Sequence, residues 1–238
     1  MKALTKTILA VLPLLVSTVS HAAFMLNGTR YVFPSDKKVI SVRVSNEGDV
    51  TFGGQVWVED PTGRNSADAH FVMTPNFFKV KGHDAQMIRM LKVNSSVLPE
   101  DRESLFILNV QEIPPAPAEG SNALSLAVDS RVKLIYRPSP LMNAREGAEA
   151  RVKVSSNGSR LTVNNPTPYF FAVTDIRYNH HSLTLSEEDQ KKVHILAPFS
   201  EASLAVKVPA GNTGFSYDAI DDYGATNHYP EGDKGAST

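Results

Sequence analysis

The segment that decides the fold runs from Asn122 to Pro138 and reads NALSLAVDSRVKLIYRP. Apolar side chains occupy every second position, interrupted only by Ser130, at Leu124, Leu126, Val128, Val132, Leu134 and Tyr136. This alternation predicts a β-strand of about fourteen residues, whereas ordinary strands have about five or six. At about 3.3 Å per residue the strand would span roughly 45 Å, more than one small domain needs. Part of its apolar row is therefore available to contact something other than its own core.

Shorter alternating segments recur through the chain, separated by turn residues, and no long stretch has helical spacing. Strands are predicted at 40–44, 56–58, 87–93, 105–110, 152–154, 161–163, 169–176, 194–196, 204–208 and 215–220. Many short strands indicate an all-β sandwich rather than alternating α/β units. The polar tail at 225–238 is expected to be disordered in part.

The first 22 residues have the features of an export signal. Lys2 and Lys6 give a positive start, an apolar run at 8–16 follows, and Ser20-His21-Ala22 ends the segment with small residues. The run is too short to span a bilayer, which favours a cleaved signal peptide over a membrane anchor. The expected organisation is a signal peptide at 1–22, a first sandwich domain at 23–140, and a second at 141–238 that includes the polar tail.

Charge and cysteine content narrow the function. Removal of the signal leaves 22 basic against 25 acidic residues, a net charge of −3. This value does not indicate nucleic acid or an anionic membrane as partner, and no later apolar run reaches transmembrane length. The chain has no cysteine, which excludes thiol catalysis and thiolate metal sites and leaves stability to burial.

Nothing in the sequence indicates an enzyme, a metal site or a cofactor. It contains no Gly-x-Ser-x-Gly elbow, no phosphate-binding glycine loop and no His-Glu-x-x-His pattern. His180 and His181 are adjacent, and adjacent side chains on a strand face opposite ways. Asp221-Asp222 lacks the ligand spacing of a calcium site. We therefore expect no catalytic residue, no metal and no cofactor.

Five motifs in order resemble the periplasmic pilus chaperones of the chaperone–usher pathway, the PapD-like family, over nearly the whole mature chain. The motifs are 28–33 (GTRYVF), 98–115 (LPEDRESLFILNVQEIPP), 132–138 (VKLIYRP), 165–169 (NPTPY) and 220–224 (IDDYG). The short spacing between Ile113-Pro114-Pro115 and Leu124 resembles the branch with a short loop before the donor strand, which mostly serves rod-like pili.

The resemblance implies two immunoglobulin-like domains in a boomerang arrangement, with a cleft between them. It implies a chaperone that binds, folds and caps pilus subunits in the periplasm and delivers them to an outer-membrane usher. Such a subunit is a sandwich that lacks its last strand, and the chaperone lends its own long strand to fill the groove. Covering an apolar groove and an open strand edge is a sufficient task for a protein without an active site.

The resemblance also assigns residues. Arg30 and Lys133 would bind the C-terminal carboxylate of the subunit, and we call them the carboxylate anchor. Leu124, Leu126 and Val128 would be the lent residues of the donor strand. Glu103, Arg137 and Asp222 would form the interdomain ionic set, which fixes the angle between the domains.

Other interpretations stay open at this stage. Leu124, Leu126 and Val128 could instead belong to an ordinary core strand, and the five charged residues could be solvated surface groups. The rival function is a secreted immunoglobulin-like adhesin or a structural pilus component. A pilin would need an alternating extension before its first core strand, and only 23–28 precede Thr29. The sequence does not tell whether the free protein caps its strand by pairing with a second copy, nor whether the second domain has a complete last strand.

Overall fold

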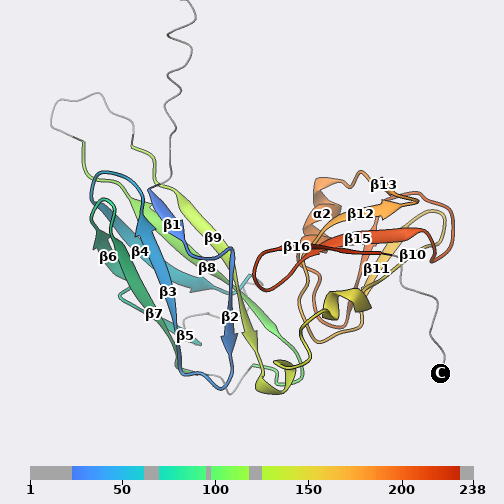
Figure 1. Cartoon of the computed structure of the whole chain (residues 1–238), viewed down its shortest axis with the longest axis horizontal. Coiled ribbons are helices and arrows are strands. Elements are labelled where there is room, and N and C mark those ends of the chain that lie inside the picture. The colour runs from blue at the N-terminus through green and yellow to red at the C-terminus, as the bar shows by residue number, and fades with distance from the viewer. Residues whose placement is uncertain (1–22, 62–69, 95–97, 118–124, 231–238) are drawn as a thin grey trace, which may run out of the picture.

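The protein consists of two β-sandwich domains placed side by side at an angle (Figure 1). The computed structural model describes residues 23–61, 70–94, 98–117 and 125–230. The signal segment at 1–22 lies outside these residues. In the part that is described, no helix is long and apolar enough to cross a membrane.

The described residues of the first domain form nine strands in two sheets. One sheet has the order β2-β9-β8-β4-β6 and the other the order β1-β3-β7-β5. The strands are β1 (Phe24–Leu26), β2 (Arg30–Pro34), β3 (Val39–Asn46), β4 (Phe52–Glu59), β5 (Phe71–Thr74), β6 (Phe77–Val80), β7 (Ala85–Lys92), β8 (Ser104–Ile113) and β9 (Asp129–Arg137).

The first strand of this domain changes sheets partway, and this leaves an edge open. β1 pairs with β3 in one sheet, whereas β2 pairs with β9 in the other, in parallel. β2 covers β9 only from Lys133 to Arg137, whereas β8 pairs with β9 from Asp129 to Tyr136. Among the described residues, the edge of β9 on the β2 side is therefore unpaired from Asp129 to Val132.

The second domain is also a sandwich, with sheets in the order β10-β11-β14 and β13-β12-β15-β16. Two 3-10 turns, Ser139–Leu141 and Ala148–Arg151, lead into it. Its elements are β10 (Lys153–Ser156), β11 (Leu161–Asn165), β12 (Val173–Tyr178), β13 (His181–Ser182), α2 (Glu187–His194), β14 (Ser200–Leu204), β15 (Phe215–Ile220) and β16 (Thr226–Tyr229).

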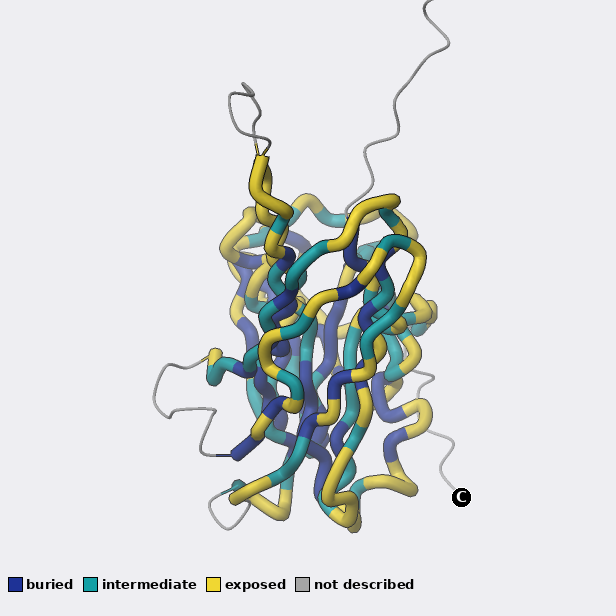
Figure 2. Tube along the Cα trace, turned by 90° about the vertical axis from the view of Figure 1, so that its left-hand side faces the viewer, coloured by how far each residue is buried: buried dark blue, intermediate teal, exposed yellow. Residues whose placement is uncertain are grey.

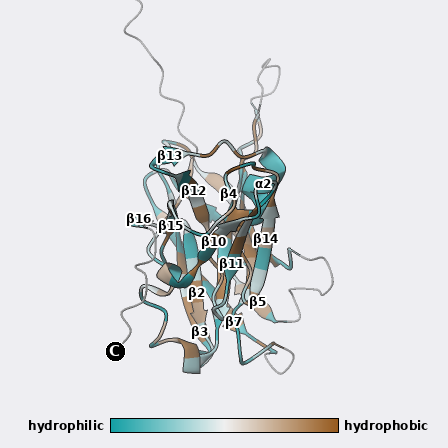
Figure 3. Cartoon of the chain, turned by 90° about the vertical axis from the view of Figure 1, so that its right-hand side faces the viewer, coloured by the Kyte–Doolittle hydropathy of each residue, from teal (hydrophilic) through white to brown (hydrophobic). Residues whose placement is uncertain are grey.

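Each domain has a core of its own, made by the inward faces of its two sheets. The first core includes Phe33, Val42, Val44, Ile88, Met90, Leu108, Val110 and Leu134, each fully buried. The second includes Leu161, Val163, Val173, Ile176, Leu204 and Ala219. Hydrophobic and hydrophilic residues alternate along the strands of both domains (Figure 3), as the period of two predicts.

The structure corrects several expectations about elements and shows a last strand that the sequence left open. The strand expected at 204–208 is β14, which ends at Leu204, and the strand expected at 169–176 begins only at Val173. β9 has nine residues rather than about fourteen, since its ladder with β8 begins at Asp129. His194 ends a helix and does not belong to a strand; Ser186 caps this helix by accepting a hydrogen bond from the Asp189 amide. Part of the polar tail forms β16, which pairs with β15 and gives the second domain a last strand.

Candidate functional site

Strand register brings Arg30 and Lys133 side by side in the cleft between the domains. Arg30 is the first residue of β2 and pairs with Lys133 of β9. Side chains alternate along β9, so Leu134 and Tyr136 enter the core while Lys133 and Ile135 point away from it. The two cations predicted to form the carboxylate anchor therefore lie together on the face that the second domain approaches.

Among the described residues, the hydrogen bonds of both cations to the second domain go to neutral carbonyl groups. Arg30 Nη1 donates to the Ile220 carbonyl at 3.2 Å, and Lys133 Nζ donates to the carbonyl of His194 at the end of α2. Arg30 Nε is buried and has no hydrogen-bond partner among the described residues. A buried donor without a partner is costly, so it marks a position where an acceptor is expected.

The environment of Lys133 also favours binding of an anion. Burial, together with the charge of Arg30, lowers the pKa of Lys133 to about 8. Burial likewise lowers the pKa of Arg30, and Asp222 opposes that shift. A carboxylate placed between these two cations would stabilise their charged forms and offset their mutual repulsion. It would also accept strong, directional charge-assisted hydrogen bonds from both.

A second arginine of the same face, Arg137, is fully paired. Its Nε donates to Glu103 Oε1 at 2.5 Å, and its Nη1 and Nη2 donate to the two carboxylate oxygens of Asp222 at 2.6 and 2.9 Å. Glu103 comes from the first domain and Asp222 from the second. The structure thus brings together the three residues predicted as the interdomain ionic set.

The two carboxylates of this set respond differently to burial. Glu103 is almost inaccessible, and burial raises its pKa even though Arg137 opposes the shift. Burial also opposes ionisation of Asp222, but the hydrogen bonds and charge of Arg137 outweigh it and lower the pKa of Asp222. In both carboxylates Arg137 is the main group that favours the charged form.

The motif at 165–169 supports the ionic set from the second domain. The Asn165 side chain accepts hydrogen bonds from the Thr167 amide and hydroxyl and donates to the Tyr169 and Ala197 carbonyls. This fixed loop presents the Phe170 amide to Glu103 Oε2 at 2.6 Å. The Pro168 carbonyl accepts from the Glu103 amide at 2.9 Å, which closes the contact between the domains.

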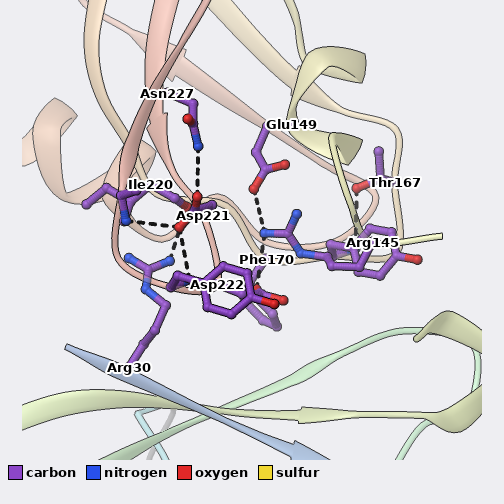
Figure 4. A network of polar contacts seen from close by, with 12 residues as sticks. Arg30, Arg145, Glu149, Thr167, Phe170, Ile220, Asp221, Asp222 and Asn227 are labelled. Carbon is purple, nitrogen blue, oxygen red and sulfur yellow. Dashed lines mark hydrogen bonds and ion pairs between the residues drawn. The ribbon is translucent and has the colours of Figure 1, made fainter. Parts of the chain in front are cut away.

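Sequence reasoning missed Arg145, which extends the ionic set (Figure 4). Arg145 Nη2 contacts Glu149 Oε1 at 2.6 Å and Asp222 Oδ1 at 3.4 Å. Its guanidinium lies over the rings of Tyr169 and Phe171, at 5.4 and 5.2 Å from their centroids. The i, i+4 spacing of Arg145 and Glu149 was visible in the sequence, but nothing there showed that both side chains are buried.

The donor-strand residues lie on the segment that leads into β9. Leu124 falls outside the described residues. Leu126 is 70% exposed and Val128 is 40% exposed, and neither belongs to a strand. Figure 2 draws the start of this segment as exposed tube that projects from the sandwich. A core strand would bury these side chains, so this observation opposes the interpretation as an ordinary core strand.

Comparison with known proteins agrees with this geometry. Residues 23–142 match the family model described as "Pili and flagellar-assembly chaperone, PapD N-terminal domain", and residues 147–231 match "Pili assembly chaperone PapD, C-terminal domain". The chain belongs to the PapD-like family of pilus-assembly chaperones.

Individual relatives extend over the same length. The chaperone protein FanE of Escherichia coli is 40% identical over 213 residues, which cover 90% of this chain and 92% of that protein. The crystal structure of the YadV chaperone has a TM-score of 0.70 at 29% identity and covers 87% of this chain and 98% of its own. That of the periplasmic chaperone SfaE has a TM-score of 0.67 at 31% identity, covering 87% and 99%.

Proposed function

We propose that this protein is a periplasmic chaperone that binds and caps pilus subunits by donor-strand complementation and delivers them to an outer-membrane usher. Residues 1–22 would direct export, and the two domains would meet near residue 140. The protein would act without catalysis, metal or cofactor, since its family is one of assembly chaperones. One feature supports the proposal most directly: an open strand edge leads to two cations that, among the described residues, form no ion pair with a carboxylate and donate to backbone carbonyls.

The open edge offers a place for a strand of the subunit. From Asp129 to Val132, β9 is paired with β8 on one side only, among the described residues. An unpaired edge presents backbone donors and acceptors to an incoming strand, and the exposed Leu126 and Val128 supply side chains for its groove. Subunit binding would satisfy both the backbone groups and the apolar row.

The anchor lies where such a strand would end. Arg30 is the first residue of β2, so a strand added in line with β2 along β9 would meet Arg30 and Lys133 at its end. If that end is a C-terminal carboxylate, the added strand runs in the direction of β2 and hence parallel to β9. The carboxylate would then fix the register of the subunit strand, since a slip would move it away from both cations.

The donor row can be tested by placing charge on it. Wild-type protein with an affinity tag would first identify its subunit in periplasmic extract by mass spectrometry. The double variant Leu126→Asp with Val128→Asp should then fold normally, because both side chains are exposed, and should lose the subunit on co-expression. Met87→Asp is the matched control, since Met87 is an exposed apolar residue on the outer sheet face, far from the open edge.

The results separate the alternatives. An unfolded double variant by circular dichroism would mean that the segment is a core strand, because buried unpaired carboxylates are not tolerated. Full subunit recovery by a folded double variant would contradict the donor role. A wild-type protein that purifies as a polymer instead of one-to-one with a subunit would favour an adhesin or structural pilus component.

A further inference from the structure

Tyr223 is an exposed aromatic residue at the mouth of the cleft, and none of the contacts described above accounts for it. Its relative exposure is 96%, the largest among the exposed apolar residues. It lies in the turn between β15 and β16 and lines, together with Arg30, Tyr31 and Val32, a hollow of about 420 Å³. A tyrosine so placed offers a flat apolar face beside the carboxylate anchor.

The turn that carries Tyr223 is held by its own hydrogen bonds. Asp221 Oδ1 accepts from the amides of Tyr223 and Ala225, each at 2.9 Å, and Asp221 Oδ2 accepts from Asn227 Nδ2 at 2.9 Å. The Asp221 amide donates to the Ala225 carbonyl at 2.9 Å. An aromatic side chain on a fixed backbone loses little conformational entropy on binding.

The same turn is also fixed against the first domain. Gly224 has φ +88°, and a Cβ there would come within 2.6 Å of Thr29 Oγ1. Arg30 donates to the Ile220 carbonyl just before the turn. Figure 4 shows Asp221 and Asp222 close to Arg30, with the Asp221 side chain directed to Asn227 of its own turn. The position of Tyr223 relative to the anchor is therefore set by contacts on both sides of the turn.

We propose that Tyr223 is a specificity-determining residue that contacts one apolar side chain next to the C-terminal carboxylate of the captured subunit. The inference rests on the proposed function, since it requires the carboxylate at Arg30 and Lys133. Successive side chains of an extended strand face opposite ways. Only one of the last two side chains of the subunit can therefore face Tyr223, and the other faces the first domain.

Synthetic peptides allow the contact and the anchor to be tested separately. The probes are acetylated twelve-residue peptides of alternating valine and threonine, with phenylalanine or alanine at the last or the penultimate position. Each is made with a free or an amidated C-terminus. Dissociation constants come from NMR titration of ¹⁵N-labelled protein, for the wild type, Tyr223→Ala and Tyr223→Phe. Phe77→Ala is the control, since Phe77 is exposed on β6, away from the cleft.

We expect the wild type to prefer phenylalanine over alanine at one of the two positions. Tyr223→Ala should reduce that preference by about 2–10-fold, the range expected for an aromatic pair, and Tyr223→Phe should keep it. Phe77→Ala should leave it unchanged. Amidation should weaken binding equally in the wild type and in Tyr223→Ala, because it removes only the charge that the anchor binds.

Other results would overturn the inference. If Tyr223→Ala keeps the preference for phenylalanine while amidation still weakens binding, the role of Tyr223 is contradicted and the carboxylate anchor is supported. Equal losses at both positions contradict the alternation on which the contact depends. If amidation does not change the dissociation constant, the carboxylate anchor is contradicted, and with it the role of Tyr223.

Discussion

Lys133 and Arg137 lie four residues apart on the same face of β9, yet their partners differ in kind. Arg137 is 3% exposed and binds two carboxylates, one from each domain. Lys133 donates to a neutral carbonyl and stands beside another cation, Arg30. A cation paired with buried carboxylates, such as Arg137, is needed for the fold. A cation whose folded neighbours are neutral or positive, such as Lys133, is available to an anionic ligand.

The largest expected effect comes from removing Arg137, which binds Glu103 and Asp222. Arg137→Ala would leave the buried Glu103 carboxylate without its cation and Asp222 with only the longer contact to Arg145. We expect a cost of about 3–5 kcal/mol in free energy of unfolding. For a chain of this size, Tm should fall by roughly 6–20 °C. Differential scanning calorimetry measures this change, and small-angle scattering should show a looser arrangement of the domains.

Arg131→Ala is the matched control for that variant. Arg131 lies on the same strand and forms an ion pair with Glu59 at 2.9 Å, but the Arg131 side chain is 56% exposed and that of Glu59 is 39% exposed. Its loss should cost about 0–1 kcal/mol. Equal melting temperatures for Arg137→Ala and Arg131→Ala would mean that the interdomain ionic set is a surface feature and that the comparison fails.

The second effect concerns Lys133 and should appear in subunit binding rather than in the stability of the fold. Lys133→Ala removes one of the two charges offered to the subunit carboxylate, which should weaken capture by about 2–5 kcal/mol. The same variant should be at least as stable as the wild type, because it removes a half-buried charge that Arg30 repels. Co-purification measures capture, and calorimetry measures stability.

If Lys133→Ala still captures its subunit, the assignment of Lys133 to the carboxylate anchor is contradicted. One that loses both subunit and stability would show that Lys133 belongs with Arg137 as a structural residue. Lys133→Arg keeps the charge and should retain part of the capture.

A third, smaller effect tests whether the paired region extends to Arg145. Arg145→Ala leaves the carboxylate of Glu149 buried without its closest partner and should cost about 1–3 kcal/mol. The loss should be smaller than that for Arg137→Ala, because Asp222 keeps both of its bonds to Arg137. Unfolding in urea ranks the two variants. A larger loss for Arg145→Ala would place the main interdomain contact around Glu149.

Alternation in the sequence was enough to predict the two sandwiches on physical grounds, whereas the site residues were proposed from the resemblance to the pilus chaperones. Alternation shows which face of a strand is buried, so β3, β7, β8 and β15 were predicted close to their observed bounds, whereas only residues 56–58 of β4 were predicted. The residues of the interdomain ionic set were named through motifs whose side chains meet across the domains.

What the sequence did not reveal depends on neighbours that are distant along the chain. The alternation from Leu124 to Tyr136 is interrupted only at Ser130 and continues on both sides of it, so it did not show that the strand begins at Asp129, where pairing with β8 begins. Helix α2 is short and was missed, although Ser186 followed by acidic residues is a capping signal. The carbonyls opposite Arg30 and Lys133 could not be predicted, since backbone groups leave no mark in a sequence.

The smallest expected effect concerns the pH dependence of capture, which tests whether Lys133 lacks a negatively charged partner in the free protein. In the free protein its pKa is lowered to about 8, chiefly by burial and further by Arg30. A bound carboxylate favours the charged form and raises that pKa, so capture should be constant below pH 8. Affinity should then fall, by at most tenfold per pH unit, as the pH rises above 8 and binding must first restore the proton. Subunit retention on a column between pH 6.5 and 9.5 measures this dependence. Lys133→Arg should show none over that range, because arginine stays charged. A wild-type profile that stays flat to pH 9.5 would mean that Lys133 remains fully charged in the free cleft and that neither burial nor Arg30 lowers its pKa as far as 8.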